Sequence, residues 1–188
     1  MNVICCTLNA KYIHTNLAIR YLKVYASPEF DIKLKEYTIK DPIMNIVTDL
    51  YQQKPTVIGF SCYIWNIEET IKVVNMLKKI DHSIQIVLGG PEVSYDTVEW
   101  MEKIPNVDFI VLGEGEKTFK QLLFELSGEG TLKNVHGIAY REKEQVRITP
   151  QMNKLDLKEL PSPYRFHEDL VHSFPEMNKV FMKTVRRG

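Results

Sequence analysis

The chain has 188 residues, 44% of them hydrophobic and 26% charged, which is enough to enclose a sizeable hydrophobic core. Lys plus Arg and Asp plus Glu both total 24, and this zero net charge argues against a protein held to nucleic acid by bulk positive charge. No apolar run approaches the ~18 residues of a membrane span, and the first residues lack the pattern of a secretory signal. We therefore expect a cytoplasmic protein without nucleic-acid or membrane partners.

Strand and helix patterns alternate along the first two thirds of the chain. Short apolar or alternating runs predict strands, and apolar residues repeated at i, i+3 and i+4 predict amphipathic helices. Ser94 is placed to cap the fourth helix. The predicted strands are residues 2–7, 31–37, 56–61, 83–90 and 107–115, and the predicted helices are residues 16–26, 42–53, 67–80, 96–104 and 116–126.

These strand–helix units predict an α/β fold, a doubly wound five-stranded parallel sheet with helices on both faces. The second strand, residues 31–37, alternates apolar and charged side chains in the manner of an edge strand. This favours the flavodoxin-like strand order 2-1-3-4-5. In that order, ligands bind at the carboxyl ends of the strands, near the switch point between the first and third strands.

The pattern changes after residue 129. Residues 130–150 are typical of a β-hairpin with its turn at about 142–145. Residues 151–188 contain three prolines and no long periodicity, which is typical of a linker. We therefore divide the chain into an α/β domain (1–129), a hairpin appendage (130–150) and a linker (151–188).

Cys5, Cys6 and Cys62 match no zinc-binding spacing. Cys5 and Cys6 are adjacent in a strand and should point to its opposite faces. We expect three reduced thiols packed as small hydrophobic side chains, and no metal site.

The loops expected at the carboxyl end of the sheet lack several known signatures. Residues 8–16 contain no glycine, whereas a dinucleotide site needs G-x-G-x-x-G after the first strand. The segment GEGEKT has Glu116 where a P-loop needs a glycine before its lysine. Thr7 and Ser61 stand where a phosphoacceptor receiver domain needs acidic residues.

Two features of these loops remain as candidates for a ligand site. Ser61 offers a hydroxyl donor and acceptor at the end of the third strand. Gly89 and Gly90, at the end of the fourth strand, allow the backbone to approach a bulky ligand closely. The alternative is ordinary turn chemistry, because glycine after a strand is common.

The spacing of these residues resembles that of cobalamin-binding domains of the methionine-synthase and mutase type. Those domains carry S-x-L, a spacer and a double glycine. Here Ser61-Cys62-Tyr63 and Gly89-Gly90 are separated by residues 64–88. The D-x-H-x-x-G motif of their first loop is absent, and Tyr63 replaces the leucine.

Most of the chain is similar to one subgroup, the N-terminal cobalamin-binding domain of B12-binding radical SAM proteins. This group includes the anaerobic magnesium-protoporphyrin IX monomethyl ester cyclases. The order and spacing of several segments carry the resemblance: TLNAKYIHTNLAIRYL, IGFSCYIWN, IVLGGPEVS, DFIVLGEGE, GIAYRE and LDLKELPSPY. In that family the linker leads to a strand ending R-G-C, whose cysteine is an iron–sulfur ligand, and this chain ends V-R-R-G.

The resemblance implies a domain that positions cobalamin for a radical SAM enzyme. The catalytic barrel, its 4Fe–4S cluster and S-adenosylmethionine would belong to the parent chain, so the fragment should have no turnover of its own. The parent would be an Fe–S oxidoreductase, cyclase or methyltransferase acting on an unknown small molecule. The barrel of the same full-length chain would be the partner of this domain.

The resemblance also implies roles for single residues. Ser61 is similar to the serine that hydrogen-bonds the benzimidazole tail of cobalamin, with a strand-end cap as the alternative. Tyr63 and Trp65 would cover the corrin ring, contact the barrel or pack in the core. His14 is expected to be a loop or domain-contact residue rather than a cobalt ligand.

The glycine loops complete the implied site. Gly89 and Gly90 would flank the tail, and residues 113–115 would contact its phosphate or ribose, with ordinary turns as the alternative. The predicted cofactor-binding residues are Asn9, Ala10, Ser61, Tyr63, Gly89, Gly90, Gly113, Glu114 and Gly115.

Two other functions remain open from the sequence. A degenerate domain could keep the fold and lose the cofactor, and aromatic side chains filling the tail pocket would indicate this. A nucleotide- or coenzyme-binding α/β domain would need backbone amides that hold phosphate, for which GEGEKT is the only candidate.

Overall fold

The structure is a computed structural model that describes residues 1–11, 15–128, 131–143, 145–156, 158 and 160–163. The predictions for His14 and for the linker beyond residue 163 lie outside these residues. The strands are β1 (Val3–Asn9), β2 (Ile32–Thr38), β3 (Val57–Ser61), β4 (Gln85–Gly89), β5 (Phe109–Val111), β6 (Ile138–Glu142) and β7 (Gln145–Ile148). The helices are α1 (Leu17–Ala26), α2 (Ile43–Gln52), α3 (Ile67–Ile80), α4 (Pro91–Ser94), α5 (Thr97–Lys103) and α6 (Gly115–Leu126), with a short 3₁₀ turn η1 (Leu132–Asn134).

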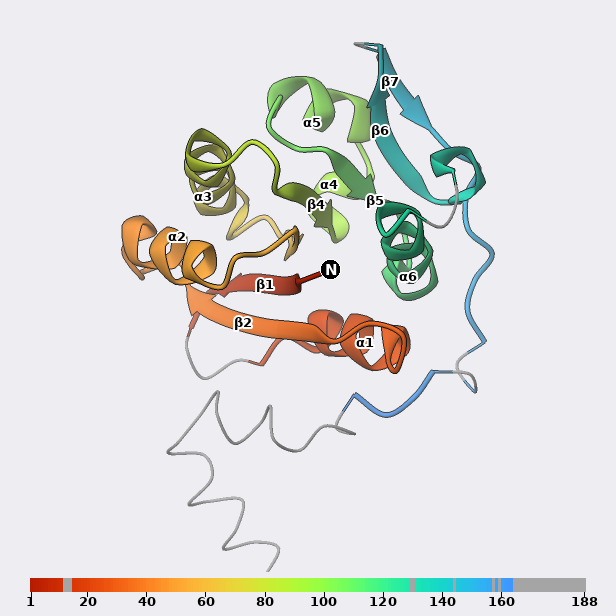
Figure 1. Ribbon diagram of the computed structural model, residues 1–188, viewed down its shortest axis with the longest axis horizontal. Coiled ribbons are helices and arrows are strands. Elements are labelled where there is room, and N and C mark those ends of the chain that lie inside the picture. The colour runs from red at the N-terminus through yellow and green to blue at the C-terminus, as the bar shows by residue number, and fades with distance from the viewer. Residues whose placement is uncertain (12–14, 129–130, 144, 157, 159, 164–188) are drawn as a thin grey trace, which may run out of the picture.

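The strands form one sheet with the order β2-β1-β3-β4-β5-β6-β7 (Figure 1). Strands β1 to β5 are parallel, so the predicted order 2-1-3-4-5 is confirmed, with β2 at the edge. The sheet has seven strands rather than the predicted five, because β6 pairs antiparallel with β5 and β7 with β6. The hairpin therefore continues the sheet, and Ile138, Ala139 and Tyr140 of β6 are buried there.

Two hydrophobic cores lie on the two faces of the sheet. Helices α2, α3 and α5 cover one face, and α1 and α6 cover the other (Figure 1). Cys6 is buried in the first core and Cys5 in the second, as the alternation of side chains along β1 predicts. All three cysteines are buried and free, which confirms that they pack as small hydrophobic side chains.

The prediction that Ser94 caps a helix was wrong. Pro91 begins a short helix, α4, and Ser94 is its last residue, whose hydroxyl donates to the Gly90 carbonyl at 2.8 Å. Proline suits a first helical position because its φ is already helical and its missing N–H needs no partner. Helix α5 follows separately, with Asp96 at its N-cap position.

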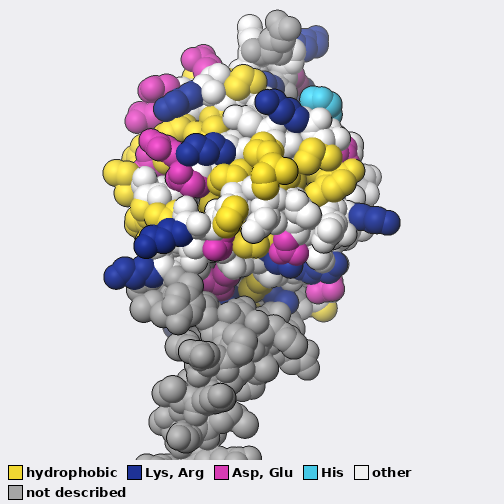
Figure 2. All heavy atoms as spheres, turned by 90° about the vertical axis from the view of Figure 1, so that its left-hand side faces the viewer, with side chains coloured by type: hydrophobic (Ala, Val, Ile, Leu, Met, Phe, Trp, Pro, Cys, Tyr) yellow, Lys and Arg dark blue, Asp and Glu magenta, His cyan; other side chains and the backbone are white. Residues whose placement is uncertain are grey.

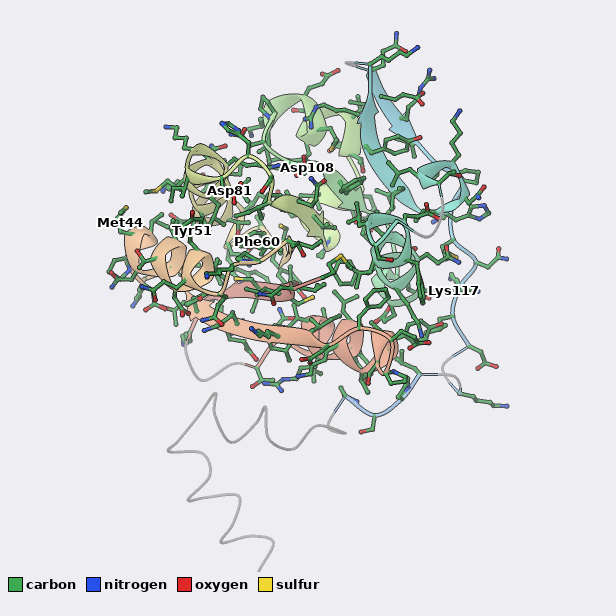
Figure 3. All side chains as sticks on the ribbon, in the orientation of Figure 1. Met44, Tyr51, Phe60, Asp81, Asp108 and Lys117 are labelled. Carbon is green, nitrogen blue, oxygen red and sulfur yellow. The ribbon has the colours of Figure 1, made fainter. Side chains whose placement is uncertain are left out.

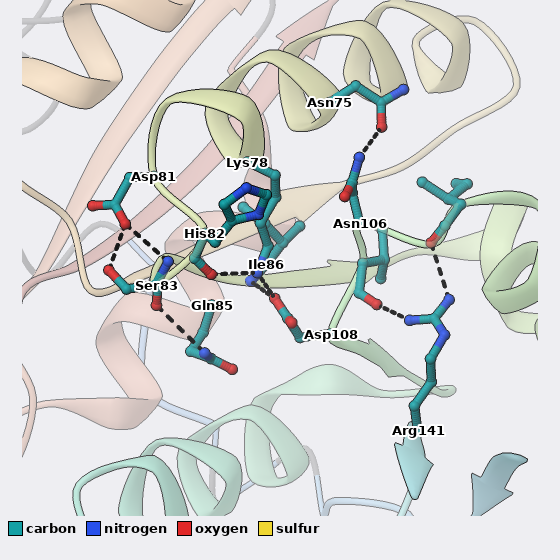
Figure 4. Close-up of polar contacts among 12 residues, drawn as sticks. Asn75, Lys78, Asp81, His82, Ser83, Gln85, Ile86, Asn106, Asp108 and Arg141 are labelled. Atoms are coloured by element: carbon teal, nitrogen blue, oxygen red, sulfur yellow. Dashed lines mark hydrogen bonds and ion pairs between the residues drawn. The ribbon is translucent and has the colours of Figure 1, made fainter. Parts of the chain in front are cut away.

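Polar side chains tie the elements together at the amino ends of β4 and β5 (Figure 4). The Asp108 carboxylate accepts from the Ile86 backbone N–H and pairs with Lys78, both at 2.7 Å. The Arg141 guanidinium, reaching from β6, donates to the carbonyls of residues 101, 104 and 107, where α5 ends and β5 approaches. These contacts fix α3, α5 and the hairpin at the end of the sheet away from its carboxyl edge.

The outer face around α2 and α3 is chemically mixed (Figure 2). Met44 and Tyr51 of α2 are exposed, and Figure 3 shows both at the outer side of the helix layer. Basic and acidic side chains are interspersed on this face (Figure 2). In the described residues, no helix is long and apolar enough to cross a membrane.

Candidate functional site

A cavity of about 730 Å³ lies between the sheet and helices α1 and α6. The ends of β3, β4 and β5 form its floor, and Ala18, Ile19 and Leu22 of α1 face Phe119 of α6 across it. Most of its lining is apolar. Its volume falls in the range of about 300–1,000 Å³ that is common for small-molecule and cofactor sites.

The register of the parallel strands brings distant loops together at this cavity. Ser61 at the end of β3 pairs with Gly89 at the end of β4, and Gly89 pairs with Val111 of β5. The carboxyl ends of parallel strands share one edge, so the loops that follow these residues are neighbours.

Most of the predicted site residues line the cavity. These are Ser61, Tyr63, Gly89, Gly90, Gly113, Glu114 and Gly115. Asn9 and Ala10 are not among its lining residues. The Asn9 side chain instead reaches toward β2, where its amide donates to Glu36 at 2.9 Å.

The two glycines at the end of β4, Gly89 and Gly90, have different physical roles. Gly90 has φ +111°, and a Cβ on it would lie 2.5 Å from the carbonyl oxygen of Cys62. The fold therefore requires glycine at position 90, with or without a ligand. A Cβ on Gly89 would meet nothing closer than 3.7 Å, so packing does not require glycine there. The missing side chain of Gly89 leaves space in the cavity.

Ser61 is held by a polar cluster at the base of α1. Asn16 caps α1 by accepting from the Ile19 N–H at 3.2 Å. This fixes the Asn16 amide so that its NH₂ group donates to Thr7 at 3.3 Å and to Ser61 at 3.5 Å. Because the Ser61 oxygen accepts here, its own O–H can donate elsewhere.

Asn66 is a residue of the site that the sequence analysis missed. It is fully buried, and its NH₂ group donates to the carbonyls of Leu8 and Ser61, both at 3.0 Å. Its side-chain oxygen accepts from the Tyr63 N–H at 2.8 Å. Asn66 thus joins the end of β1 to the loop after β3. In the sequence, the only local indication of this role is the position of Asn66 directly before the predicted helix 67–80.

Glu36 was also missed. Its carboxylate, on β2, accepts from Arg20 at 2.9 Å, from the Asn9 side chain at 2.9 Å and from the Asn16 backbone N–H at 3.0 Å. The Arg20 and Glu36 side chains are only 2% and 5% exposed. One buried carboxylate therefore fastens both ends of the loop between β1 and α1. The alternation of apolar and charged residues at 31–37 had instead indicated that the charged side chains of this strand, including Glu36, face solvent.

Aromatic side chains stand beside the cavity. The rings of Tyr63 and Trp65 are stacked, with their centres 4.5 Å apart and their planes 6° from parallel. Trp65 is 48% exposed and the intervening Ile64 is 77% exposed. Core packing, one of the alternatives for Trp65, is therefore not its role.

The buried thiols of the described residues are not suited to thiolate chemistry. Burial raises the pKa of the Cys62 thiol to about 12 and that of the Cys5 thiol further, so both stay protonated at neutral pH. The described residues hold no group of three His, Cys, Asp or Glu side chains arranged for a metal ion.

Fold and cavity define a flavodoxin-like α/β domain with a ligand site at the carboxyl ends of its parallel strands. Residues 4–123 match the sequence model of the family described as the B12 binding domain. The chain belongs to this family, and its cofactor is cobalamin.

Comparisons with single proteins point to one branch of the family. The cobalamin-dependent radical SAM methyltransferase TokK of Streptomyces tokunonensis is 30% identical over 161 residues, which cover 82% of this chain and 23% of TokK. The anaerobic magnesium-protoporphyrin IX monomethyl ester cyclase of Synechocystis sp. is 40% identical over 75 residues, covering 38% of this chain and 15% of the cyclase. The domain thus resembles that of cobalamin-dependent radical SAM enzymes.

The fold likeness extends over nearly the whole chain. The cobalamin-dependent S-adenosylmethionine radical enzyme OxsB, solved with aqua-cobalamin and S-adenosylmethionine bound, superposes with a TM-score of 0.78 at 22% identity. The match covers 92% of this chain and 25% of OxsB. The chain spans a third or less of the length of the curated relatives it matches.

Proposed function

We propose that the domain holds the nucleotide tail of cobalamin in the cavity between the sheet and helices α1 and α6. The corrin ring would then lie over the carboxyl ends of the strands, beside Tyr63 and Trp65. The observation that carries this proposal is the cavity itself, about 730 Å³ of space at the register-matched ends of β3 and β4. Gly89 supports it, because a side chain there would fill space that the fold leaves open.

Each part of the tail has a chemically suitable neighbour. The Ser61 O–H can donate to a ring nitrogen of the benzimidazole base, since Asn16 already donates to the Ser61 oxygen. Helix α6 begins at Gly115 with no side-chain cap, so the backbone N–H groups of its first turn can donate to the tail phosphate. Gly113 has φ +65° and nothing within 4 Å of a Cβ, which leaves room beside that phosphate.

The chain's own residues bind, orient and shield the cofactor, and the cofactor supplies the chemistry at cobalt. We propose that this serves a radical SAM enzyme, with the barrel, the 4Fe–4S cluster and the S-adenosylmethionine site in the rest of the parent protein. That enzyme would act on a small molecule in the cytoplasm, by methyl transfer or oxidative cyclisation. The 188-residue chain by itself would have no turnover.

The two alternatives receive less support. A degenerate domain was expected to fill the tail pocket with aromatic side chains, but the space between α1, α6 and the sheet is open. A nucleotide-binding domain also needs backbone amides that hold phosphate, which the α6 N-terminus could supply, but the loop after β1 lacks the glycines of a dinucleotide site.

Titration of the purified chain with hydroxocobalamin, followed by absorbance and calorimetry, tests the proposal. We expect saturable binding with the spectrum of cobalamin whose benzimidazole has left cobalt. Ser61→Ala should weaken binding about fivefold, the worth of one hydrogen bond. Gly89→Val should weaken it further by filling the cavity. Ser127→Ala, an exposed serine on the far end of α6, is the matched control.

The choice of variants follows from the glycine geometry. Gly90→Val is not informative, because its side chain would clash with the Cys62 backbone and perturb the fold. Circular dichroism should show that Ser61→Ala and Gly89→Val remain folded. A folded chain that shows no saturable binding at micromolar hydroxocobalamin would contradict the proposal.

A further inference from the structure

The last residue of β7 and the segment that follows it lie at the cofactor cavity. Ile148, Thr149 and Gln151 all line it, together with the ends of β3, β4 and β5. These residues follow the part of the chain that matches the B12-binding family, residues 4–123. The sequence alone had assigned residues from 151 onward to a linker. Gln151, the first residue of that predicted linker, lines the cavity.

Backbone contacts hold this segment against the sheet. The Gly137 N–H donates to the Pro150 carbonyl at 2.7 Å, and the Thr149 N–H donates to the Ile138 carbonyl at 2.9 Å. A Cβ on Gly137 would lie 3.4 Å from the Cβ of Met152, so the glycine allows the segment to pass close to β6. Figure 1 shows the segment descending from β7 past α6.

Glu114 fastens the segment farther along. Its carboxylate accepts from the Leu155 backbone N–H at 3.0 Å. Glu114 belongs to the loop 113–115, all of which lines the cavity between β5 and α6. The same short loop thus faces the ligand space on one side and holds residue 155 on the other. A ligand that fixes the loop must also restrict the segment.

We propose that residues 148–155, here called the arm, form a wall of the cobalamin site, and that Glu114 is the residue that positions it. This inference rests on the proposed function. Because Glu114 both lines the cavity and holds Leu155, the position of the arm is coupled to occupancy of the cavity. By linkage, an ordered arm favours cobalamin binding to the same degree that bound cobalamin orders the arm.

Amide hydrogen exchange of the 188-residue chain, measured by mass spectrometry with and without saturating hydroxocobalamin, tests this coupling. In the wild type, peptides covering 149–156 should exchange more slowly when cobalamin is bound. Glu114→Ala should speed exchange of the arm in the free chain and reduce the protection that cobalamin gives it. It should also weaken cobalamin binding about threefold, as expected for one exposed charge-assisted hydrogen bond.

Two further variants separate positioning from a general structural effect. Glu114→Gln keeps an oxygen acceptor for the Leu155 N–H and should restore most of the arm protection. Glu102→Ala, an exposed glutamate on α5 away from the cavity, is the matched control and should behave as the wild type.

The outcomes are distinguishable. If hydroxocobalamin protects the ends of β3 and β4 but leaves exchange of the arm unchanged, cobalamin binds without the arm and the inference is refuted. Equal behaviour of Glu114→Ala and Glu102→Ala would refute the role of Glu114. Failure of the folded wild type to bind hydroxocobalamin at all would refute the proposed function, and the inference with it.

Discussion

Replacement of Glu36 by glutamine should destabilise the protein strongly, because its carboxylate is buried and paired. The Glu36 carboxylate accepts three hydrogen bonds, one of them from the buried Arg20 guanidinium. Glu36→Gln leaves that guanidinium buried without its counter-charge. Removing one partner of a buried ion pair costs about 3–5 kcal/mol. This is a large part of a total stability that is typically about 5–15 kcal/mol.

Urea unfolding followed by circular dichroism measures this loss. With a urea m-value of about 2 kcal/mol/M, the midpoint should fall by about 2 M. Glu69→Gln removes one partner of the solvent-exposed Glu69–Lys72 pair and should leave the midpoint unchanged within error. If Glu36→Gln and Glu69→Gln shift the midpoint equally, the buried Glu36 carboxylate does not hold the loop between β1 and α1.

Three further predictions concern the backbone, the amino edge of the sheet and the thiols. Gly90→Ala should lower the thermal midpoint strongly and Gly89→Ala only slightly, because only the former meets the Cys62 carbonyl and needs a positive φ; equal melting temperatures would contradict this. Arg141→Met removes the guanidinium donor from the carbonyls of residues 101 and 107 and should cost about 1–3 kcal/mol in urea unfolding, whereas the exposed Arg147→Met should have little effect. Burial raises the pKa of the Cys62 thiol from 9.0 to about 12, so the unfolded chain loses its proton first and stability should fall as pH rises from about 9 toward 12. Unfolding midpoints across this range, with Cys62→Ala as the comparison, test the last point; a pH dependence that is the same without the thiol would contradict it.

The sequence predicted the parts of the fold that follow from local periodicity. Adjacent cysteines in β1 point to opposite faces because side chains alternate along any strand. The alternating strand at residues 31–37 lies at the sheet edge, and the strand–helix alternation gives the order of the parallel strands. Ser61 and Gly89 end neighbouring parallel strands, so their proximity also follows from the sequence pattern.

The sequence pattern was less informative where a side chain serves a distant partner. Gly90 and Gly89 are indistinguishable in sequence, yet only Gly90 is required by the approach of the Cys62 backbone. Ser94 has the residue type of a helix cap, but it is the last residue of a separate short helix that begins at Pro91. In both cases the outcome depends on which backbone atoms lie within a few ångströms.

Tertiary structure alone decided three features of the site. The hairpin extends the sheet because β5 offers an unpaired edge that β6 can satisfy. Glu36 is buried because Arg20, from a helix on the neighbouring layer, neutralises it there. The start of the arm lies at the cavity because backbone hydrogen bonds join residues 149 and 150 to residues 137 and 138. Periodicity is a property of neighbouring residues and can be recognised in a single chain. Hydrogen bonds and ion pairs between distant residues form only after the chain has folded, and these contacts shape the cofactor site.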